Sequence, residues 1–168
     1  LHFDDAPLDF VRAGVDLALT VGLPQAERLV VRKLCDNEVT VVAAPSLVDE
    51  RGQPAEFAEL ATWPIVAYRS ALGAVTSWRY ADAGEIRTLE VEPALTVSDG
   101  VSLLVSARRG LGAAYVSRFS AAEDLDAGTL VELLPDVALP AYAPVYTVKA
   151  DLTLVSARVR AFEACLDE

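Results

Sequence analysis

The sequence predicts a mixed α/β fold with a largely parallel sheet, because strand-like and helix-like patterns alternate along the whole chain. Residues 39–44 and 64–68 are continuously apolar, which is typical of strands buried on both faces of a sheet. An apolar stripe predicts a terminal helix packed against that sheet, formed by Val155, Val159, Phe162 and Leu166. With 168 residues, 53% of them hydrophobic, the chain is long enough to bury one or two compact cores.

The expected elements are bounded by residues suited to turns and helix caps. Ser98 and Asp99 form a good N-cap for a helix that Gly110 closes, and Ser46 and Asp49 have the spacing of a capping box. In chain order we expect a strand tail at 1–3, a short helix at 4–14, strands at 15–21 and 39–44, a helix from 45, a short helix at 56–60, strands at 64–68 and 87–97, the helix at 98–110, a strand at 112–116, a short helix at 121–125, and strands at 129–134 and 142–148.

Two stretches are expected to carry the chain from one lobe to another. The first is 35–41 and the second is 134–144, which has prolines at 135, 140 and 144. They indicate a chain that leaves one lobe, builds a second and returns.

The composition favours a soluble, cytosolic protein with no metal and no cofactor. Cys35 and Cys165 lie far apart and lack zinc-site spacing, so we interpret both as free thiols of a reducing compartment. No apolar run approaches the roughly 20 residues that span a bilayer, and the N-terminus lacks the layout of a signal peptide. A net charge of -11 repels the phosphate backbone, so we expect any DNA-reading element to lie outside this chain.

Six phrases stand in a fixed order across nearly the whole chain. They are RAGVDLAL at 12–19, VVAAPS at 41–46, WRY at 78–80 followed by VEPALTVSD at 91–99, ARRGLGAAY at 107–115, GTLVELLP at 128–135 and RVRAF at 158–162. Taken together in this order, the phrases resemble the effector-binding domain of LysR-type transcriptional regulators.

The resemblance implies a fold like that of type-2 periplasmic binding proteins, in which two Rossmann-like lobes hold an effector in the cleft between them. Lobe I would comprise residues 1–40 and 143–168, and lobe II residues 41–142. The family's winged helix-turn-helix, and the strand and helix that open its lobe I, would then precede Leu1. The resemblance also implies a small-molecule effector, a homo-oligomeric parent (dimer or tetramer), and DNA contact only through the winged helix.

Most candidate effector contacts follow the expected strands of lobe II. Tyr68, Arg69 and Ser70 follow one buried strand, and Ser117 and Arg118 follow another, where ligands collect at the carboxyl ends of parallel strands. Each arginine either pairs with an acidic effector or lies solvated with its stem buried.

Helix starts supply the other candidates. Ser98 and Asp99 open a helix whose amide end suits a carboxylate, although Ser98 is equally an ordinary N-cap. Asp4 and Asp5 stand at a strand-to-helix turn that faces the family's cleft, where they accept a hydrogen bond from the effector or cap the helix. Gly22 ends the next strand and would form part of the same wall.

Two other functions share this fold: a solute-binding protein of a transport system, and an enzyme such as a deaminase or dehydratase. An enzyme needs a nucleophile or an acid/base pair, yet His2 is the sole histidine and stands at the start of the chain. The pair Gly110 and Gly112 lacks the third glycine of a dinucleotide fingerprint. The phrases at 91–99 and around Gly110 favour the regulator, so we predict a sensing domain without catalytic activity.

Overall fold

The computed structural model describes residues 14–23, 29–70, 73–150 and 156–166. The chain forms two compact units, one of Leu1–Asn37 with Ala143–Glu168 and the other of Glu38–Tyr142. It therefore passes from one unit to the other at Asn37 and returns at Tyr142. The assignment of lobes I and II as functional halves stays a prediction.

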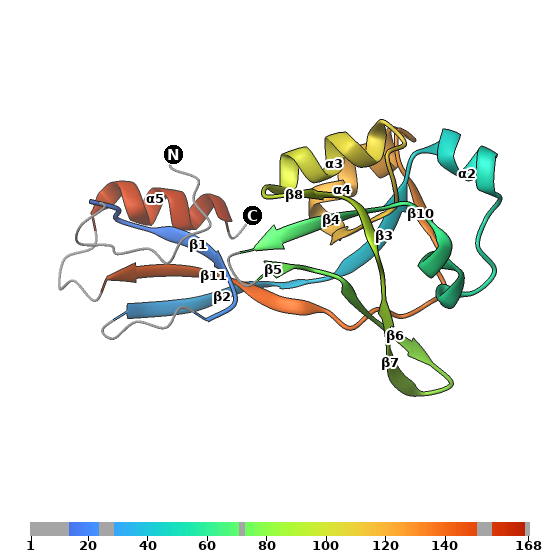
Figure 1. Ribbon diagram of the computed structural model, residues 1–168. Helices are drawn as coiled ribbons and strands as arrows, with labels where there is room; N and C mark the ends of the chain where they lie inside the picture. Colours follow the sequence, from blue (N-terminus) through green and yellow to red (C-terminus); the bar gives the residue numbers. More distant parts are fainter. Residues whose placement is uncertain (1–13, 24–28, 71–72, 151–155, 167–168) are drawn as a thin grey trace. The chain divides into compact units, whose positions relative to one another are not determined.

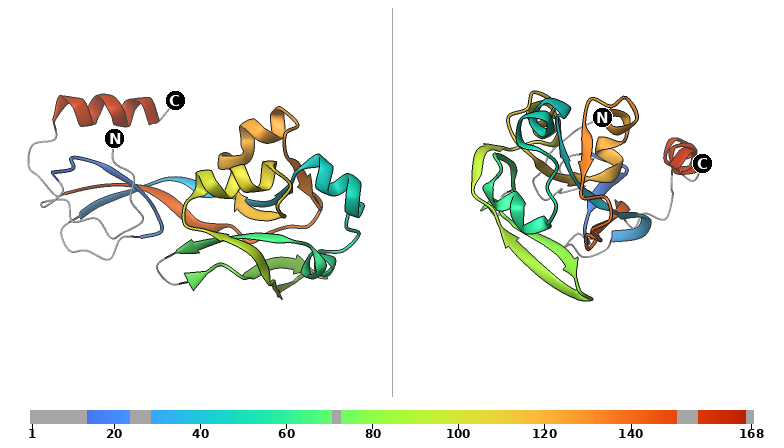
Figure 2. Two further views of the ribbon diagram at one scale, coloured as in Figure 1. Left: turned by 45° about the horizontal axis from the view of Figure 1, so that its top comes forward. Right: turned by 90° about the vertical axis from the view of Figure 1, so that its right-hand side faces the viewer.

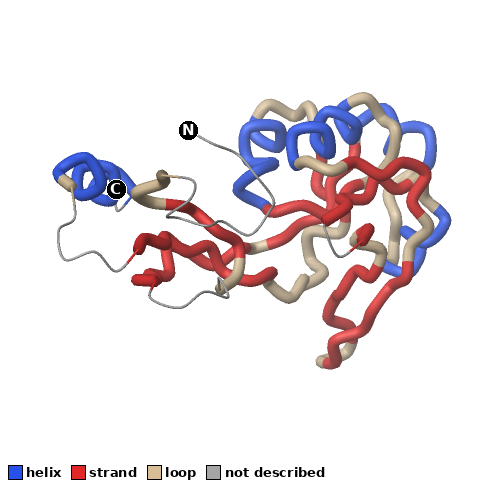
Figure 3. Tube along the Cα trace, turned by 60° about the vertical axis from the view of Figure 1, so that its left-hand side comes forward, coloured by secondary structure: helices blue, strands red, loops and turns tan. Residues whose placement is uncertain are grey.

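The first unit contains a three-stranded sheet in the order β1–β11–β2. These strands are β1 (Ala18–Val21), β2 (Leu29–Asn37) and β11 (Tyr142–Ala150), and β1 runs antiparallel to β11 with Ala18 opposite Val148. Helix α5 (Ala157–Leu166) is the C-terminal helix drawn in blue in Figure 3. It is tied to β11 because Lys149 Nζ donates a hydrogen bond of 2.8 Å to Glu163 Oε1.

The predicted stripe of the terminal helix is only partly confirmed. Val159 is buried, whereas Phe162 is 43% exposed, and Val155 lies outside the described residues. In α5 the stripe is therefore interrupted at Phe162, whose side chain is partly exposed to solvent.

The second unit is organised around five strands in the order β10–β3–β9–β4–β8, with a short strand, β5 (Gly73–Ala74), beside the end of β4. The five are β3 (Val39–Ala43), β4 (Ile65–Ser70), β8 (Pro93–Val97), β9 (Ala114–Ser117) and β10 (Val131–Leu133). A parallel bridge between Ile65 and Ala113 joins β9 to β4. At this bridge Ala113 N donates to Pro64 O at 2.8 Å, and Val66 N donates to Ala113 O at 2.9 Å.

The prediction of a largely parallel sheet is wrong for β3. Strands β4, β8 and β9 run in one direction, but β3 is antiparallel to both of its neighbours, β9 and β10. The physical reason is the route of the chain, which enters this unit at Glu38, beside the end of β9. The first strand therefore has to run away from the edge at which the others end.

Helices α3 (Gly100–Arg108) and α4 (Arg118–Asp126) cover one face of this sheet (Figures 1 and 2). Val42, Val66 and Ala114 point into the cluster beneath them, which Leu103 and Leu130 complete. An ion pair between α3 and α4 accompanies this layer, because the buried Asp124 accepts hydrogen bonds at Oδ1 from Arg108 Nη1 at 3.1 Å and from Thr129 Oγ1 at 2.6 Å.

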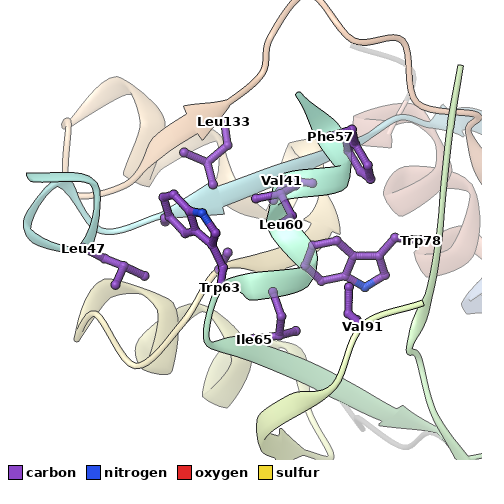
Figure 4. Packing of buried hydrophobic residues seen from close by; sticks show 11 residues of the cluster. Val41, Leu47, Phe57, Leu60, Trp63, Ile65, Trp78, Val91 and Leu133 are labelled. Atoms are coloured by element: carbon purple, nitrogen blue, oxygen red, sulfur yellow. The ribbon is translucent and has the colours of Figure 1, made fainter. Parts of the chain in front are cut away.

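The opposite face packs against α2 (Pro45–Arg51), the 3-10 helix η1 (Phe57–Thr62) and a hairpin of β6 (Ser77–Asp82) and β7 (Glu85–Glu90). Figure 4 shows Trp63 and Trp78 on either side of Leu60 in this cluster. The Phe57 ring stacks on Tyr80 with centroids 4.4 Å apart, which fixes η1 against the hairpin.

The structure corrects two further expectations. The strand predicted at 87–97 is two strands, because the chain leaves the hairpin at Val91, whose amide bonds to Thr76 O, and β8 starts at Pro93. The capping box of Ser46 is absent as well, since α2 begins one residue earlier, at Pro45, and its N-cap Ala44 has no side-chain acceptor.

Gly112 is expected to tolerate no side chain. A Cβ at this position would lie 2.6 Å from Pro64 O, at the bridge between β9 and β4. Gly112→Ala should therefore lower the free energy of unfolding by about 1–3 kcal/mol, as overpacking does, in a urea titration. Gly100→Ala is the control, because a Cβ there has no heavy atom within 4 Å. Equal stability of the two variants would contradict the role assigned to the bridge.

A substitution in the turn of the β6–β7 hairpin should stabilise the protein. Ala83 and Gly84 have φ of 50° and 84°, the pattern of a type I′ turn, in which an alanine is strained. Ala83→Asn should raise the free energy of unfolding by about 0.5–1 kcal/mol because asparagine tolerates this backbone. Gly84→Ala should lower it, and a urea titration measures both. A destabilised Ala83→Asn variant would show that the turn has another conformation in solution.

Candidate functional site

Most candidate residues meet at one edge of the second unit's sheet. We call this the carboxyl edge and define it as residues 68–70, 98–99 and 117–118, where β4, β8 and β9 end. Tyr68 is paired with Val97, and Ser117 is paired with Val39 at the start of β3. The parallel course of β4, β8 and β9 therefore confirms that these segments share an edge, whereas effector contact stays a prediction.

At the start of α3, Asp99 rather than Ser98 is the N-cap. Asp99 Oδ1 accepts a hydrogen bond of 2.8 Å from Ser102 N, and this bond, with one from the Ser102 hydroxyl, holds the pKa of Asp99 below its ordinary value. The expected capping role of Ser98 is thus wrong, and its exposed hydroxyl has no hydrogen-bond partner in the described part of the chain. Because a carboxylate already occupies this helix end, it is less suited to an anionic ligand than the sequence indicated.

At the start of α4, Ser117 is the N-cap, but its half-buried hydroxyl makes no capping hydrogen bond within the described residues. The first amide of the helix is already used, since Arg118 N donates to Glu38 O at 2.8 Å. This bond fixes the entry of the chain into β3 next to the end of β9.

Arg118 is engaged within the protein. Its Nη1 donates to Glu132 Oε1, which also accepts a hydrogen bond of 2.8 Å from the hydroxyl of Thr40. Burial alone would raise the pKa of Glu132, but the bonds from Arg118 and Thr40 hold it below its ordinary value. The same bond raises the pKa of Arg118. Arg118 therefore offers little free charge to an effector.

The three candidates at the end of β4 have different environments. Tyr68 packs against the cluster beneath α3, and Ser70 Oγ donates to Gly73 O at 3.3 Å. Arg69 is exposed and has no hydrogen-bond or ion-pair partner among the residues that the structure describes. It is therefore the cation at this edge that is available to an incoming anion.

Strand alternation places Arg69 and Ser117 on the same side of the sheet. Side chains alternate along a strand, and Tyr68 and Val116 point into the cluster beneath α3 and α4. Their neighbours Arg69 and Ser117 therefore point to the opposite side. Ser98 directly follows Val97, the partner of Tyr68, so it lies at the same edge of the sheet as Arg69.

The candidates of the first unit gain little support. Gly22 directly follows β1 and has a φ of 82°, and its amide donates to Pro144 O at 2.9 Å, so its backbone conformation accounts for the glycine without a ligand. Asp4 and Asp5 lie outside the described residues.

Neither a metal site nor a membrane span is found in the described ranges. No group of three or more His, Cys, Asp or Glu side chains there is placed to hold a metal ion. No helix of those ranges is long and apolar enough to cross a membrane.

A family model described as the LysR substrate binding domain matches residues 1–168. The chain belongs to the LysR substrate-binding domain family. Its fold is that of LysR regulatory domains, as the resemblance implied, and the family consists of transcriptional regulators rather than enzymes.

Individual relatives agree with this assignment. The domain is 28% identical over 162 residues to the HTH-type transcriptional regulator DmlR of Escherichia coli K12. This match covers 95% of this chain and 52% of that protein. The CrgA regulatory domain of Neisseria meningitidis, a LysR-type transcriptional regulator, superposes with a TM-score of 0.81 at 26% identity and covers 94% of this chain and 76% of that one. The full-length virulence activator AphB of Vibrio cholerae shares the fold, with a TM-score of 0.76 at 21% identity over 95% of this chain and 53% of that one. The chain spans about half the length of the relatives it matches.

Sequence reasoning missed the partners that neutralise Arg118. Thr40 gave one signal, because it is a hydroxyl residue inside an apolar run and buried hydroxyls are usually hydrogen-bonded. Glu132 gave none, because it stands in a strand with an ordinary alternating pattern.

Alanine substitutions of the two residues at the start of α3 should have different effects on thermal stability. Asp99→Ala should lower the thermal midpoint at neutral pH because it removes the bond to Ser102 N, whereas Ser98→Ala should leave it unchanged. Because the pKa of Asp99 is lowered on folding, its stabilisation is present above its ordinary pKa and is lost as the pH falls through the lowered value. The difference between wild type and Asp99→Ala should therefore shrink in acid. If Ser98→Ala lowers the thermal midpoint more than Asp99→Ala does, Ser98 rather than Asp99 is the N-cap.

Proposed function

We propose that this domain senses a carboxylate-bearing metabolite for a bacterial transcriptional regulator, and that the carboxylate binds at the carboxyl edge of the second unit. The observation that carries the proposal is the exposed guanidinium of Arg69, which has no hydrogen-bond or ion-pair partner in the described residues and lies at the same edge of the sheet as Ser98. Guanidinium groups bind carboxylates through two parallel hydrogen bonds, and nearby hydroxyls complete such a site.

The charge pattern of the edge supports an effector with a single localised negative group. Arg118 is neutralised by Glu132, and Asp99 is a cap that remains ionised at neutral pH. One available arginine beside one carboxylate suits a single carboxylate better than a highly charged anion. Contacts from Asp4, Asp5, Gly22, Tyr68 and Ser70 remain predictions.

We further propose that the parent protein reads DNA through a winged helix-turn-helix outside this chain and acts as a homo-oligomer. The match to proteins named HTH-type transcriptional regulators over about half of their length supports a separate DNA-binding part. The acidic composition of this chain supports the same division, because a charge of -11 opposes binding to phosphates.

The transport and enzyme alternatives are weaker. The relatives named above are regulators, which disfavours a transport protein, and the family is one of regulators rather than enzymes. We therefore propose that the domain binds its effector without transforming it.

A thermal-shift screen of aromatic acids, amino acids and dicarboxylates tests the proposal. A bound carboxylate at 100 times its Kd should stabilise the domain by about 2.7 kcal/mol. For the ligand found, Arg69→Gln should weaken binding about 10- to 100-fold in calorimetry, because it removes a charged hydrogen-bond donor.

The matched control is Arg109→Gln. Arg109 is an exposed arginine at the C-terminal end of α3, on the order of 13 Å along the helix from the carboxyl edge. The Arg109→Gln variant should bind the ligand with the affinity of wild type. Unchanged affinity in Arg69→Gln, or an equal loss in Arg109→Gln, would remove Arg69 from the site.

A further inference from the structure

A cavity lies at the edge of the second unit's sheet where β4 and β8 begin. Its volume is about 390 Å³, and it is lined by Arg51 at the end of α2, by residues 61–64 and by residues 92–94. This volume lies within the range of about 300–1,000 Å³ that is typical of small-molecule sites. We call it the amino-edge cavity. All of its lining residues belong to the second unit.

The amino-edge cavity is separate from the carboxyl edge. Pro64 lines the cavity, and Arg69 follows it along the extended β4. Each strand residue advances the chain by about 3.3 Å, so on the order of 16 Å separates the two sites. A ligand of amino-acid size bound in the cavity therefore does not reach Arg69.

Two opposite charges line the cavity without neutralising each other. Arg51 makes one hydrogen bond, from Nη1 to Thr62 O at 3.1 Å, and no ion pair within the described residues. The exposed carboxylate of Glu92 has neither a hydrogen-bond nor an ion-pair partner there. Other arginines of this unit do pair with carboxylates, namely Arg87, Arg108 and Arg118. The cavity thus holds a cation and an anion that are both available to a ligand.

The backbone beside these charges is irregular. Ile65 lies opposite Pro93 whereas Val66 lies opposite Leu95, so the exposed Ala94 is an extra residue with no partner in β4. Such bulges are rare between parallel strands and are over-represented next to functional sites. Pro64 and Pro93 also lack an N–H group, so neither of these residues presents an amide to a ligand. This makes Arg51 the charged donor of the cavity and Glu92 its charged acceptor.

We propose that the amino-edge cavity binds a free amino acid through its zwitterionic head, with the carboxylate on Arg51 and the ammonium group on Glu92. An anion would be attracted by Arg51 but repelled by Glu92, and a cation would meet the reverse, whereas a zwitterion satisfies both charges. The guanidinium group has five N–H donors, so its bond to Thr62 leaves others for a carboxylate. This ligand is additional to the effector proposed for the carboxyl edge.

The first test locates the ligand by backbone amide NMR of the purified, isotope-labelled chain. A panel of the common amino acids is titrated to about 10 mM, which detects a Kd on the order of 1 mM. At least one amino acid should shift the amide signals of Trp63 and Ala94, which line the cavity, and leave that of Ser98 in place. If no amino acid shifts Trp63 or Ala94, the proposal is overturned.

The second test compares that amino acid with two analogues that each lack one charge. One is the carboxylic acid without the amino group, and the other is the amine without the carboxylate. Wild type should bind the amino acid about tenfold or more tightly than either analogue. In Glu92→Gln the preference over the carboxylic acid should fall to about 1, while the preference over the amine persists. Arg51→Gln should show the reverse pattern. A preference that persists in both variants would overturn the proposal.

The matched controls are Arg109→Gln and Glu123→Gln. Both residues are exposed, belong to the same unit and lie outside the cavity lining, so both variants should bind the amino acid with the affinity of wild type. Arg69→Gln should do the same. If Arg69→Gln abolishes binding and Arg51→Gln does not, the amino acid binds at the carboxyl edge. That result would overturn the amino-edge site and leave the proposed function standing.

Discussion

The close approach of Gly112 to Pro64 is the constraint on which the candidate site depends. The chain forms β10–β3–β9 and β5–β4–β8 as separate ladders, and the hydrogen bonds of Ala113 join them into one layer. Those bonds require Gly112 to pass the Pro64 carbonyl at a distance that no side chain would allow. Without this contact the ends of β9 and β4 would not lie at the same edge, and Ser117 and Arg69 would belong to different surfaces.

The second requirement is that the charges around this layer are mostly neutralised within the protein. Asp124 of α4 pairs with Arg108 of α3, and Glu132 pairs with Arg118 at the end of β9. Both carboxylates have limited exposure, so leaving either unpaired would be unfavourable. With Arg118 paired, Arg69 is the cation that remains available at the carboxyl edge, which would suit the single negative group of the proposed effector.

The sequence was most informative where burial is two-sided. Residues 39–44 and 64–68 were correctly predicted as strands because β3 and β4 are covered on both faces and keep few polar residues. Gly110 also marked the end of α3 correctly, since its φ of 72° is the left-handed stop that glycine favours. The hairpin was missed because its turn residues, Ala83 and Gly84, lack the usual Asn-Gly signal.

Contacts between distant parts of the sequence explain the remaining errors. Thr40 and Glu132 are 92 residues apart, so no local pattern could show that the Thr40 hydroxyl donates a hydrogen bond to the Glu132 carboxylate. For the same reason, no local pattern could show that Glu132 neutralises Arg118. Ser98 and Asp99 are both good N-caps, and a shift of one residue decided between them.

The period-two alternation of the strands links the fold to the proposed site. Val66, Tyr68, Ala114 and Val116 point beneath α3 and α4, where they build a core that is held by paired charges. The same alternation turns Arg69 and Ser117 to the other side of the sheet, away from those helices. A shift of one residue in β4 or β9 would bury the guanidinium beneath α3 and expose core residues at the edge. The register that the Ala113 bridge fixes therefore decides in one step which residues form the core and which stay exposed at the carboxyl edge.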